Sequence, residues 1–272
     1  MIRSPLMTVM TDAVMKAART LKRDFGEVEN LQVSRKGPGN FVSAADRKAE
    51  QTLRDALEKA RPGYGLVMEE SGIVEGTDKS HRWHIDPLDG TTNFLHGLPQ
   101  FCISVGLERE GQVVAGVIYD PIKDEMFIAE RGKGAFLNNR RMRVSARRDM
   151  EDALVACGVP HIGRGNHAQF LREIATVMGR VAAVRRLGSA ALDLAYVACG
   201  RADIYWERTL HTWDEPTANG NPLSSDTSAL VRDTATTPVG TASAGTAGGP
   251  SQGNGMLVVG TTSDGKQATV RT

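Results

Sequence analysis

The composition of the chain changes abruptly near residue 215, and this change limits which part can build a folded core. Of the 58 residues from 215 to 272, 37 are Ser, Thr, Gly, Ala or Pro, and none is aromatic. Such a segment buries too little apolar surface to offset the conformational entropy lost on folding. Within it, only M-L-V-V-G at 256–260 has the pattern of a strand. We therefore expect the core before residue 215 and interpret the tail as either linker-like or the product of an altered reading frame.

Bulk properties exclude several classes of protein. The formal net charge is +1, so no global field directs the chain to nucleic acid or to an anionic membrane. Three scattered cysteines are too few for a disulfide framework and fit a reducing compartment. No apolar run approaches the roughly 20 residues of a membrane span, and the N-terminus is too polar for a secretory signal. We expect a cytoplasmic protein without a membrane segment.

The first 148 residues have the pattern of two helices followed by a series of strands. Apolar residues recur at helical spacing over 5–24, and the S-x-x-D pattern of Ser43 and Asp46 opens a second helix that ends near residue 60. Turn pairs at 110–111 and 120–121 join neighbouring strands in antiparallel order. The expected strands lie at 65–68, 81–85, 101–108, 112–119 and 125–129.

After residue 148 strands and helices alternate. We expect strands at 153–158, 184–187 and 202–206, and helices at 167–178 and 189–199. This change of pattern predicts a second sheet of different character. The predicted division is an N-terminal α+β subdomain (1–148), a C-terminal α/β subdomain (149–214) and the atypical tail (215–272).

The strongest local signal is W-H-I-D-P-L-D-G-T-T-N-F at 83–94. A strand delivers Asp86, Pro87 forces a turn, and Asp89 returns to the same side, so the two carboxylates can share one divalent cation or bridge two. Gly90 and Thr91 then open a short helix whose free N–H groups suit a phosphate oxygen. The motif predicts phosphate-ester hydrolysis. From the spacing alone, a capped turn with two exposed aspartates remains the alternative.

Three further acids are candidates for the same site. Glu69 follows a strand in M-E-E-S-G, and Glu207 and Asp214 lie in W-E-R-T-L-H-T-W-D. A solvated loop is the simpler interpretation of Glu69, and an N-cap is that of Asp214. Taken together, these acids favour an oxygen-ligand site for Mg²⁺.

Five segments, in order and spacing, resemble the inositol monophosphatase family. They are F-V-S-A-A-D-R-K-A-E, M-E-E-S-G, I-D-P-L-D-G-T-T-N-F, L-G-S-A-A-L-D-L-A and W-E-R-T-L-H-T-W-D. The resemblance covers about residues 5–214. It implies an α/β (α+β) fold, the αβαβα layered sandwich of sugar phosphatases, with a mixed or antiparallel first sheet and a smaller second sheet. It also implies a small phosphorylated polyol as substrate, two or three Mg²⁺ ions, sensitivity to Li⁺, and a homodimer.

The resemblance implies roles for individual residues as well. The first metal would be bound by Glu69, Asp86 and the Leu88 carbonyl, and the second by Asp86, Asp89 and Asp214. The backbone N–H groups of Gly90 and Thr91 would hold the phosphate. Asp46 would orient the Thr91 hydroxyl, and these two residues together with Glu69 would position the metal-bound water. The polyol hydroxyls would be contacted by Gly188, Ser189, Ala190 and Glu207.

The pattern departs from the family directly after Asp214. The family continues with a helix, whereas here E-P-T-A-N-G-N-P follows, and its Gly and Pro residues should end a helix within about one turn. We hypothesise a frame-altered C-terminus that weakens the second metal site and puts the activity of this chain in question.

Two rival functions stay open. The segment 138–148 carries five arginines, which favours a solvated hairpin face over nucleic-acid contact but leaves room for a regulatory RNA- or transcription-associated protein on the same fold. Within enzymes, fructose 1,6-bisphosphate or histidinol phosphate are alternatives to myo-inositol monophosphate as the substrate.

Overall fold

The computed structural model describes residues 3–27, 33–37, 40–162, 165–208, 256–261 and 267–268, and side chains over 3–27, 43–162 and 165–207. The helices are α1 (Pro5–Phe25), α2 (Ala44–Ala60), α3 (Thr91–Leu95), α4 (His167–Met178), α5 (Ala190–Ala198) and the short 3-10 helix η2 (Met150–Asp152). The strands are β1 (Val33–Gly37), β2 (Asn40–Ser43), β3 (Tyr64–Met68), β4 (Gly72–Val74), β5 (Asp78–Asp89), β6 (Cys102–Arg109), β7 (Gln112–Asp120), β8 (Glu125–Glu130), β9 (Gly134–Leu137), β10 (Arg140–Arg141), β11 (Leu154–Cys157), β12 (Ala183–Arg185), β13 (Ile204–Arg208), β14 (Met256–Thr261) and β15 (Gln267–Ala268).

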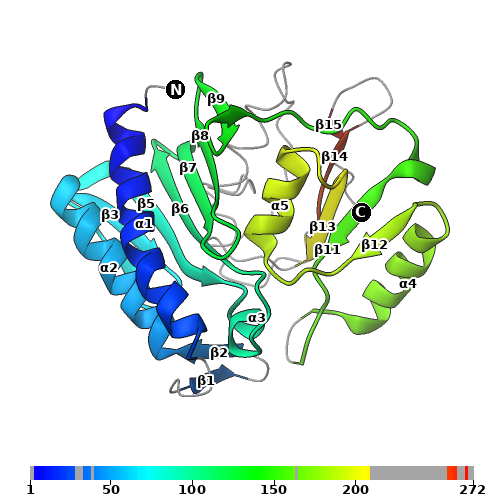
Figure 1. Cartoon of the computed structure of the whole chain (residues 1–272), viewed down its shortest axis with the longest axis horizontal. Helices are drawn as coiled ribbons and strands as arrows, with labels where there is room; N and C mark the ends of the chain where they lie inside the picture. Colours follow the sequence, from blue (N-terminus) through cyan, green and yellow to red (C-terminus); the bar gives the residue numbers. More distant parts are fainter. Residues whose placement is uncertain are drawn as a thin grey trace.

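These elements stack in five layers. Figure 1 shows α1 and α2 on one face of a large sheet, α5 between that sheet and a second one, and α4 on the far side of the second sheet. Four clusters of buried apolar residues fill the four interfaces between these layers. The αβαβα sandwich implied by the resemblance is therefore confirmed.

The first sheet has the strand order β10-β9-β8-β7-β6-β5-β3-β4. Neighbouring strands are antiparallel except for β3 and β5, which run parallel, so the sheet is mixed. A small antiparallel pair, β1 and β2, lies outside it. The strand expected at 81–85 is longer than predicted, because β5 continues through Pro87 to Asp89. Pro87 lies in an irregularity of the strand rather than in a turn that ends it.

Alternation along β8 shows how the first sheet joins two layers. Met126 and Ile128 pack in the cluster beneath α1 and α2, whereas Phe127 and Ala129 pack in the cluster that contains α5. Successive side chains of a strand point to opposite faces, so a strand buried on both sides must be apolar at nearly every position. We call the face that carries Phe127 the α5 face of the sheet.

The second sheet has the order β12-β11-β13-β14-β15. Its strands β12, β11 and β13 are parallel, and β14 adds antiparallel to β13. Here too the faces alternate: Trp206 packs toward α4, and Tyr205 toward α5. Strand β14 comes from the segment 256–260 of the predicted tail. The division of the chain at residues 148 and 214 stays a prediction.

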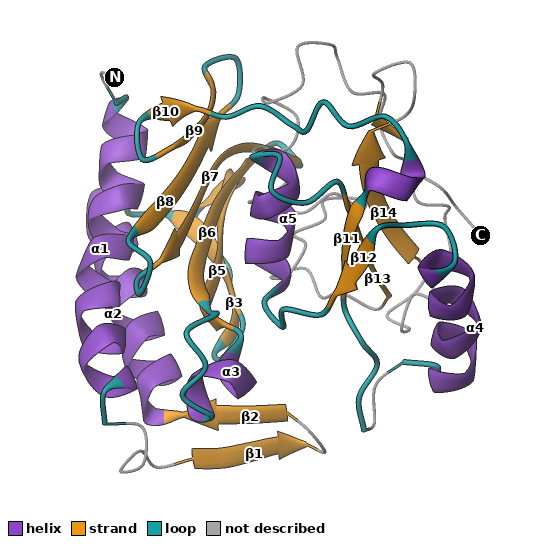
Figure 2. Cartoon of the chain, turned by 45° about the vertical axis from the view of Figure 1, so that its right-hand side comes forward, coloured by secondary structure: helices purple, strands orange, loops and turns teal. Residues whose placement is uncertain are grey.

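The helix starts follow their sequence signals. Ser4 caps α1 ahead of Pro5, and Ser43 and Asp46 form a complete capping box at α2. Figure 2 shows both helices side by side along the large sheet. Across the described ranges, no helix combines the length and apolar character needed to cross a bilayer.

Candidate active site

A bulge in β5 brings Asp86 and Asp89 to the same face of the sheet. Asp86 lies opposite Ser104 and Asp89 opposite Cys102, so three steps along β5 match two along β6. Residues three apart on a regular strand point to opposite faces, and one extra residue reverses this. Residues directly opposite each other on paired strands share a face. Because Cys102 packs with α5, both carboxylates lie on the α5 face.

Glu69 extends this row of acids onto β3. Val67 pairs with His84 and Met68 with Ile85, and the Glu69 N–H donates to the Ile85 carbonyl at 3.2 Å. The parallel register therefore continues and places Glu69 beside Asp86. Since Met68 packs beneath α1 and α2, Glu69 belongs to the opposite, α5 face.

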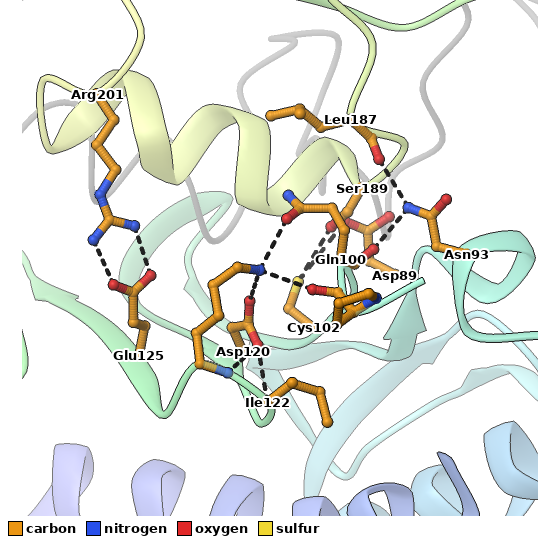
Figure 3. A network of polar contacts seen from close by, with 12 residues as sticks. Asp89, Asn93, Gln100, Cys102, Asp120, Ile122, Glu125, Leu187, Ser189 and Arg201 are labelled. Atoms are coloured by element: carbon orange, nitrogen blue, oxygen red, sulfur yellow. Dashed lines mark hydrogen bonds and ion pairs between the residues drawn. The ribbon is translucent and has the colours of Figure 1, made fainter. Parts of the chain in front are cut away.

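Asp89 caps the N-terminus of α5. Its Oδ2 accepts a hydrogen bond from Ser189 Oγ at 2.6 Å (Figure 3) and another from the Ala191 N–H at 2.8 Å, contacts that span 100 and 102 residues of sequence. A carboxylate is favoured at a helix N-terminus, where N–H groups lack partners within the helix. This contact brings the segment predicted to bind the polyol, 188–190, beside the predicted metal ligands.

The Cys102 thiol lies beneath Asp89. It points at Asp89 Oδ2 at 3.8 Å and lies 3.6 Å from Ser189 Oγ (Figure 3). Complete burial raises the pKa of Cys102 well above its ordinary value, and the charge of Asp89 raises it further. The thiol is therefore a neutral packing group that behaves as a small buried hydrophobe.

The turn after Asp89 requires glycine. Gly90 has φ +96°, and a Cβ there would lie 2.9 Å from the Gln100 carbonyl oxygen and 3.2 Å from Phe101 Cα. Left-handed backbone in such close contact is accessible to glycine alone. Gly90 is the N-cap of α3 and has no side chain that could cover the first N–H groups of the helix.

Thr91 connects this turn to α2. Its hydroxyl lies 3.0 Å from the Leu88 carbonyl oxygen and 3.2 Å from Asp46 Oδ1, and can donate to either. Asp46 is completely buried; its burial raises its pKa, although hydrogen bonds from Ser43 oppose the shift. The contact expected between Asp46 and Thr91 is present, and the catalytic roles of the two residues stay predictions.

Asn93, which sequence reasoning did not single out, joins the two halves of the site. Its Nδ2 donates to the Gln100 carbonyl at 2.7 Å and to the Leu187 carbonyl at 2.8 Å (Figure 3). A Cβ on Gly188 would meet the Asn93 amide at 2.9 Å. The available signal was its place in T-T-N-F, two residues after the candidate Thr91.

Two acids lie on the second-sheet side. Glu207, on β13, accepts a hydrogen bond from the Tyr205 hydroxyl and lies so close to Gly158 that a Cβ there would overlap it. Asp193 on α5 is 1% exposed, and burial, together with the charges of Asp89 and Glu207, raises its pKa to about 8. Asp193 was missed, although an acid within the apolar helix segment A-A-L-D-L-A was the available signal.

The donor types on this face suit a hard divalent cation. Glu69, Asp86 and Asp89 offer carboxylate oxygens on one face, and Leu88 offers a carbonyl, which are the ligand types that Mg²⁺ prefers. The charge of Asp89 helps to raise the pKa of both Cys102 and Asp193, so negative charge is concentrated around Asp89. Within the described residues, no three His, Cys, Asp or Glu side chains are arranged to hold an ion together. Asp214 lies outside those residues, and all ligand roles stay predictions.

Comparisons with known proteins agree with this geometry. Residues 3–239 match the inositol monophosphatase family. An inositol-1-monophosphatase of Mesorhizobium japonicum is 62% identical over 214 residues, 79% of this chain and 80% of that protein. The Nus factor SuhB of Pseudomonas aeruginosa is 40% identical over 233 residues, 84% of this chain and 85% of that protein.

A solved structure shares the fold. The extragenic suppressor protein suhB from Bartonella henselae superimposes with a TM-score of 0.80 at 53% identity, covering 85% of this chain and 86% of that one. The family match and the identity over most of both chains agree with the bulged β5 motif and with the five-layer fold. This chain belongs to the inositol monophosphatase family.

Proposed function

We propose that this chain hydrolyses small phosphate monoesters, with myo-inositol monophosphate as the first candidate substrate, in a reaction that depends on Mg²⁺. The observation that carries the proposal is the β5 bulge, which sets Asp86 and Asp89 on one face immediately before the Gly90 turn. A cation site next to an anion-binding turn is what phosphate-ester hydrolysis requires.

Five residues would hold Mg²⁺, two or three ions in all: Glu69, Asp86, Leu88 through its carbonyl, Asp89 and Asp214. When bound, Mg²⁺ supplies Lewis-acid chemistry that lowers the pKa of water and stabilises charge on phosphate oxygens. Asp89 already accepts two hydrogen bonds at α5, which orient its carboxylate before any cation arrives.

The residues of the chain then position the reactants. The N–H groups of Gly90 and Thr91 would hold the phosphate, and the Thr91 hydroxyl, held between Asp46 and Leu88, would orient the water together with Glu69. Attack of the water oxygen on phosphorus breaks the ester P–O bond. The released alkoxide takes up the proton that the water loses, and the products are inorganic phosphate and the polyol.

The polyol would lie between the two sheets. The segment 188–190 stands at the N-terminus of α5, and Glu207 projects from β13 on the other side. Carboxylate oxygens accept hydrogen bonds from hydroxyl groups, so an acid here suits a substrate rich in hydroxyls.

Phosphate release from myo-inositol 1-phosphate, with and without Mg²⁺, tests the proposal. We expect EDTA to abolish turnover and Asp86→Asn to lower kcat/KM by at least about 100-fold. Asp55→Asn, an exposed change on α2, is the control and should match the wild type. Turnover that persists in EDTA would refute the Mg²⁺ dependence. Phosphate release from fructose 1,6-bisphosphate and from histidinol phosphate, measured in parallel, decides which class of substrate the protein prefers.

The rival regulatory function has its own test. In the segment 138–148, Arg147 donates to both oxygens of Asp203, at 2.8 and 2.9 Å, so this arginine joins two parts of the fold. Arg140 and Arg141 are exposed. RNA binding that falls steeply with salt, in a protein without phosphatase turnover, would favour the regulatory function. RNA binding that is weak and does not depend on salt would exclude the regulatory function.

The proposal also includes inhibition by Li⁺, a homodimer and a cytoplasmic location. Li⁺ titration of activity and light scattering during gel filtration test the first two. A frame-altered C-terminus stays a hypothesis, because residues 209–255 lie outside the described residues. Resequencing the source gene tests it, and normal Mg²⁺ affinity would contradict the expected weakening of the Asp214 site.

A further inference from the structure

Helix α2 carries two buried acids one turn apart, and each contacts a segment that directly follows a strand of the candidate site. Asp46 is 0% exposed and Glu50 is 3% exposed. Residues i and i+4 lie on the same face of a helix. Asp46 contacts Thr91 at the start of α3, directly after β5, whereas Glu50 contacts the loop after β3.

Glu50 binds the two residues that directly follow Glu69. Its Oε2 accepts the Glu70 N–H at 2.8 Å, and its Oε1 accepts the Ser71 hydroxyl. A buried carboxylate is costly unless hydrogen bonds satisfy it. Each oxygen of Glu50 therefore has a partner in this loop, and the loop has little freedom to move away from α2.

The helix that bears Glu50 is itself firmly placed. Ala49, Leu53 and Leu57 are completely buried in the cluster between α1, α2 and the first sheet. Glu69, which precedes the residues that Glu50 binds, is joined to β5, because its N–H donates to the Ile85 carbonyl. The backbone of Glu69 is therefore held by a hydrogen bond to β5, and the two residues after it are held by hydrogen bonds to the Glu50 carboxylate.

We propose that Glu50 is a positioning residue, which holds the 69–71 loop so that the Glu69 carboxylate meets the cation beside Asp86. This inference rests on the proposed function, because it assigns Glu50 a task in the same cation site. Its competitor is a purely structural role, in which Glu50 stabilises the fold without affecting the site.

Two substitutions separate geometry from charge. Glu50→Gln keeps an oxygen for the Glu70 N–H and offers an amide to the Ser71 hydroxyl, which can turn to accept it. Glu50→Ala removes both bonds. The matched control is Glu58→Ala on the same helix, where Glu58 is partly exposed and paired with Arg54. The experiment measures Mn²⁺ affinity by electron paramagnetic resonance and Mg²⁺ affinity by calorimetry. It also measures thermal unfolding of the metal-free protein and steady-state kinetics.

We expect Glu50→Ala to weaken Mn²⁺ and Mg²⁺ binding by about 10- to 100-fold. The KM for inositol phosphate at saturating Mg²⁺ should change less than about twofold, and Glu50→Gln and Glu58→Ala should bind metal as the wild type does. If Glu50→Ala does not fold, Ser71→Ala removes one of the two bonds and should weaken metal binding by a smaller factor.

Three results would overturn the inference. Unchanged metal affinity in folded Glu50→Ala or Ser71→Ala, even with a lower Tm, would leave Glu50 a structural role alone. Loss of affinity in Glu50→Gln equal to that in Glu50→Ala would show that charge, not loop position, is what matters. Absence of metal binding in the wild type would refute the proposed function itself, and the positioning role with it.

Discussion

Replacing Gly90 by alanine tests the turn that joins the predicted metal ligands to the predicted phosphate site. The new Cβ would lie 2.9 Å from the Gln100 carbonyl oxygen and 3.2 Å from Phe101 Cα, both backbone atoms. A backbone neighbour cannot rotate away as a flexible side chain can. The substitution must therefore displace either the start of α3 or the segment before β6.

The expected cost has two parts. A residue other than glycine in the left-handed region costs about 1–2 kcal/mol, and forcing extra volume into a packed site costs about 1–3 kcal/mol more. Gly97→Ala is a matched control: Gly97 also has positive φ, +69°, but no atom lies within 4 Å of its added Cβ. Only the steric part distinguishes the two variants.

Thermal unfolding and phosphate release are the assays. At about 2–4 °C per kcal/mol for a chain of this size, Gly90→Ala should unfold roughly 2–12 °C below Gly97→Ala. A displacement of about 1 Å in a positioning group lowers turnover about 100-fold, so kcat/KM should fall by that factor in Gly90→Ala alone. Equal Tm and equal kcat/KM in the two variants would refute the argument from close contact.

Three further predictions concern other parts of the site and the fold. Thr91→Val removes the hydroxyl held by Asp46 and Leu88 and should lower kcat/KM by about 100-fold or more; Thr91→Ser should stay within about tenfold, and equal losses would contradict the role of the hydroxyl. The raised pKa of Asp193, about 8 instead of 3.8, means that the folded state keeps a proton which the unfolded state has lost between about pH 4 and pH 8. Stability should therefore fall as pH rises through that window. Asp193→Asn should reduce this loss of stability with rising pH, measured as the free energy of unfolding in urea with EDTA present. The same pH dependence in the variant and the wild type would contradict the raised pKa of Asp193. Phe170 stacks on Trp206 with ring centroids 5.3 Å apart, so Phe170→Ala should cost about 3–5 kcal/mol in denaturant unfolding. The neighbouring change Leu171→Ala, at a side chain that is 64% exposed, should stay within about 0.5 kcal/mol, and similar losses for both would refute the attachment of α4 through Phe170.

Much of the fold was predictable because its signals are local. The capping box of Ser43 and Asp46 marks the start of α2 in both sequence and structure, and the change from consecutive strands to alternating strands and helices marks the two sheets. The end of β5 was not predictable in the same way. Pro87 is a turn signal in isolation, yet pairing with β6 carries the strand on to Asp89.

The candidate site was predicted in part for the same reason. Asp86, Asp89 and Gly90 are adjacent in sequence, so their grouping follows from one motif. Asp193 and Glu50 were missed, because each acquires its meaning from a distant partner. Glu50 lies 20 residues from Glu70, and the raised pKa of Asp193 depends on Asp89 and Glu207.

By itself the sequence determined the long helices, the main strands of both sheets and their order, since these depend on local periodicity and capping. Its motifs also identified the family. The tertiary structure alone decided which face Asp86 and Asp89 share, because a bulge exists only relative to a partner strand. It also decided that Asp89 caps α5 through Ser189, a contact between residues 100 positions apart. Pairing and packing over such separations depend on the whole chain being folded, and no local pattern encodes them.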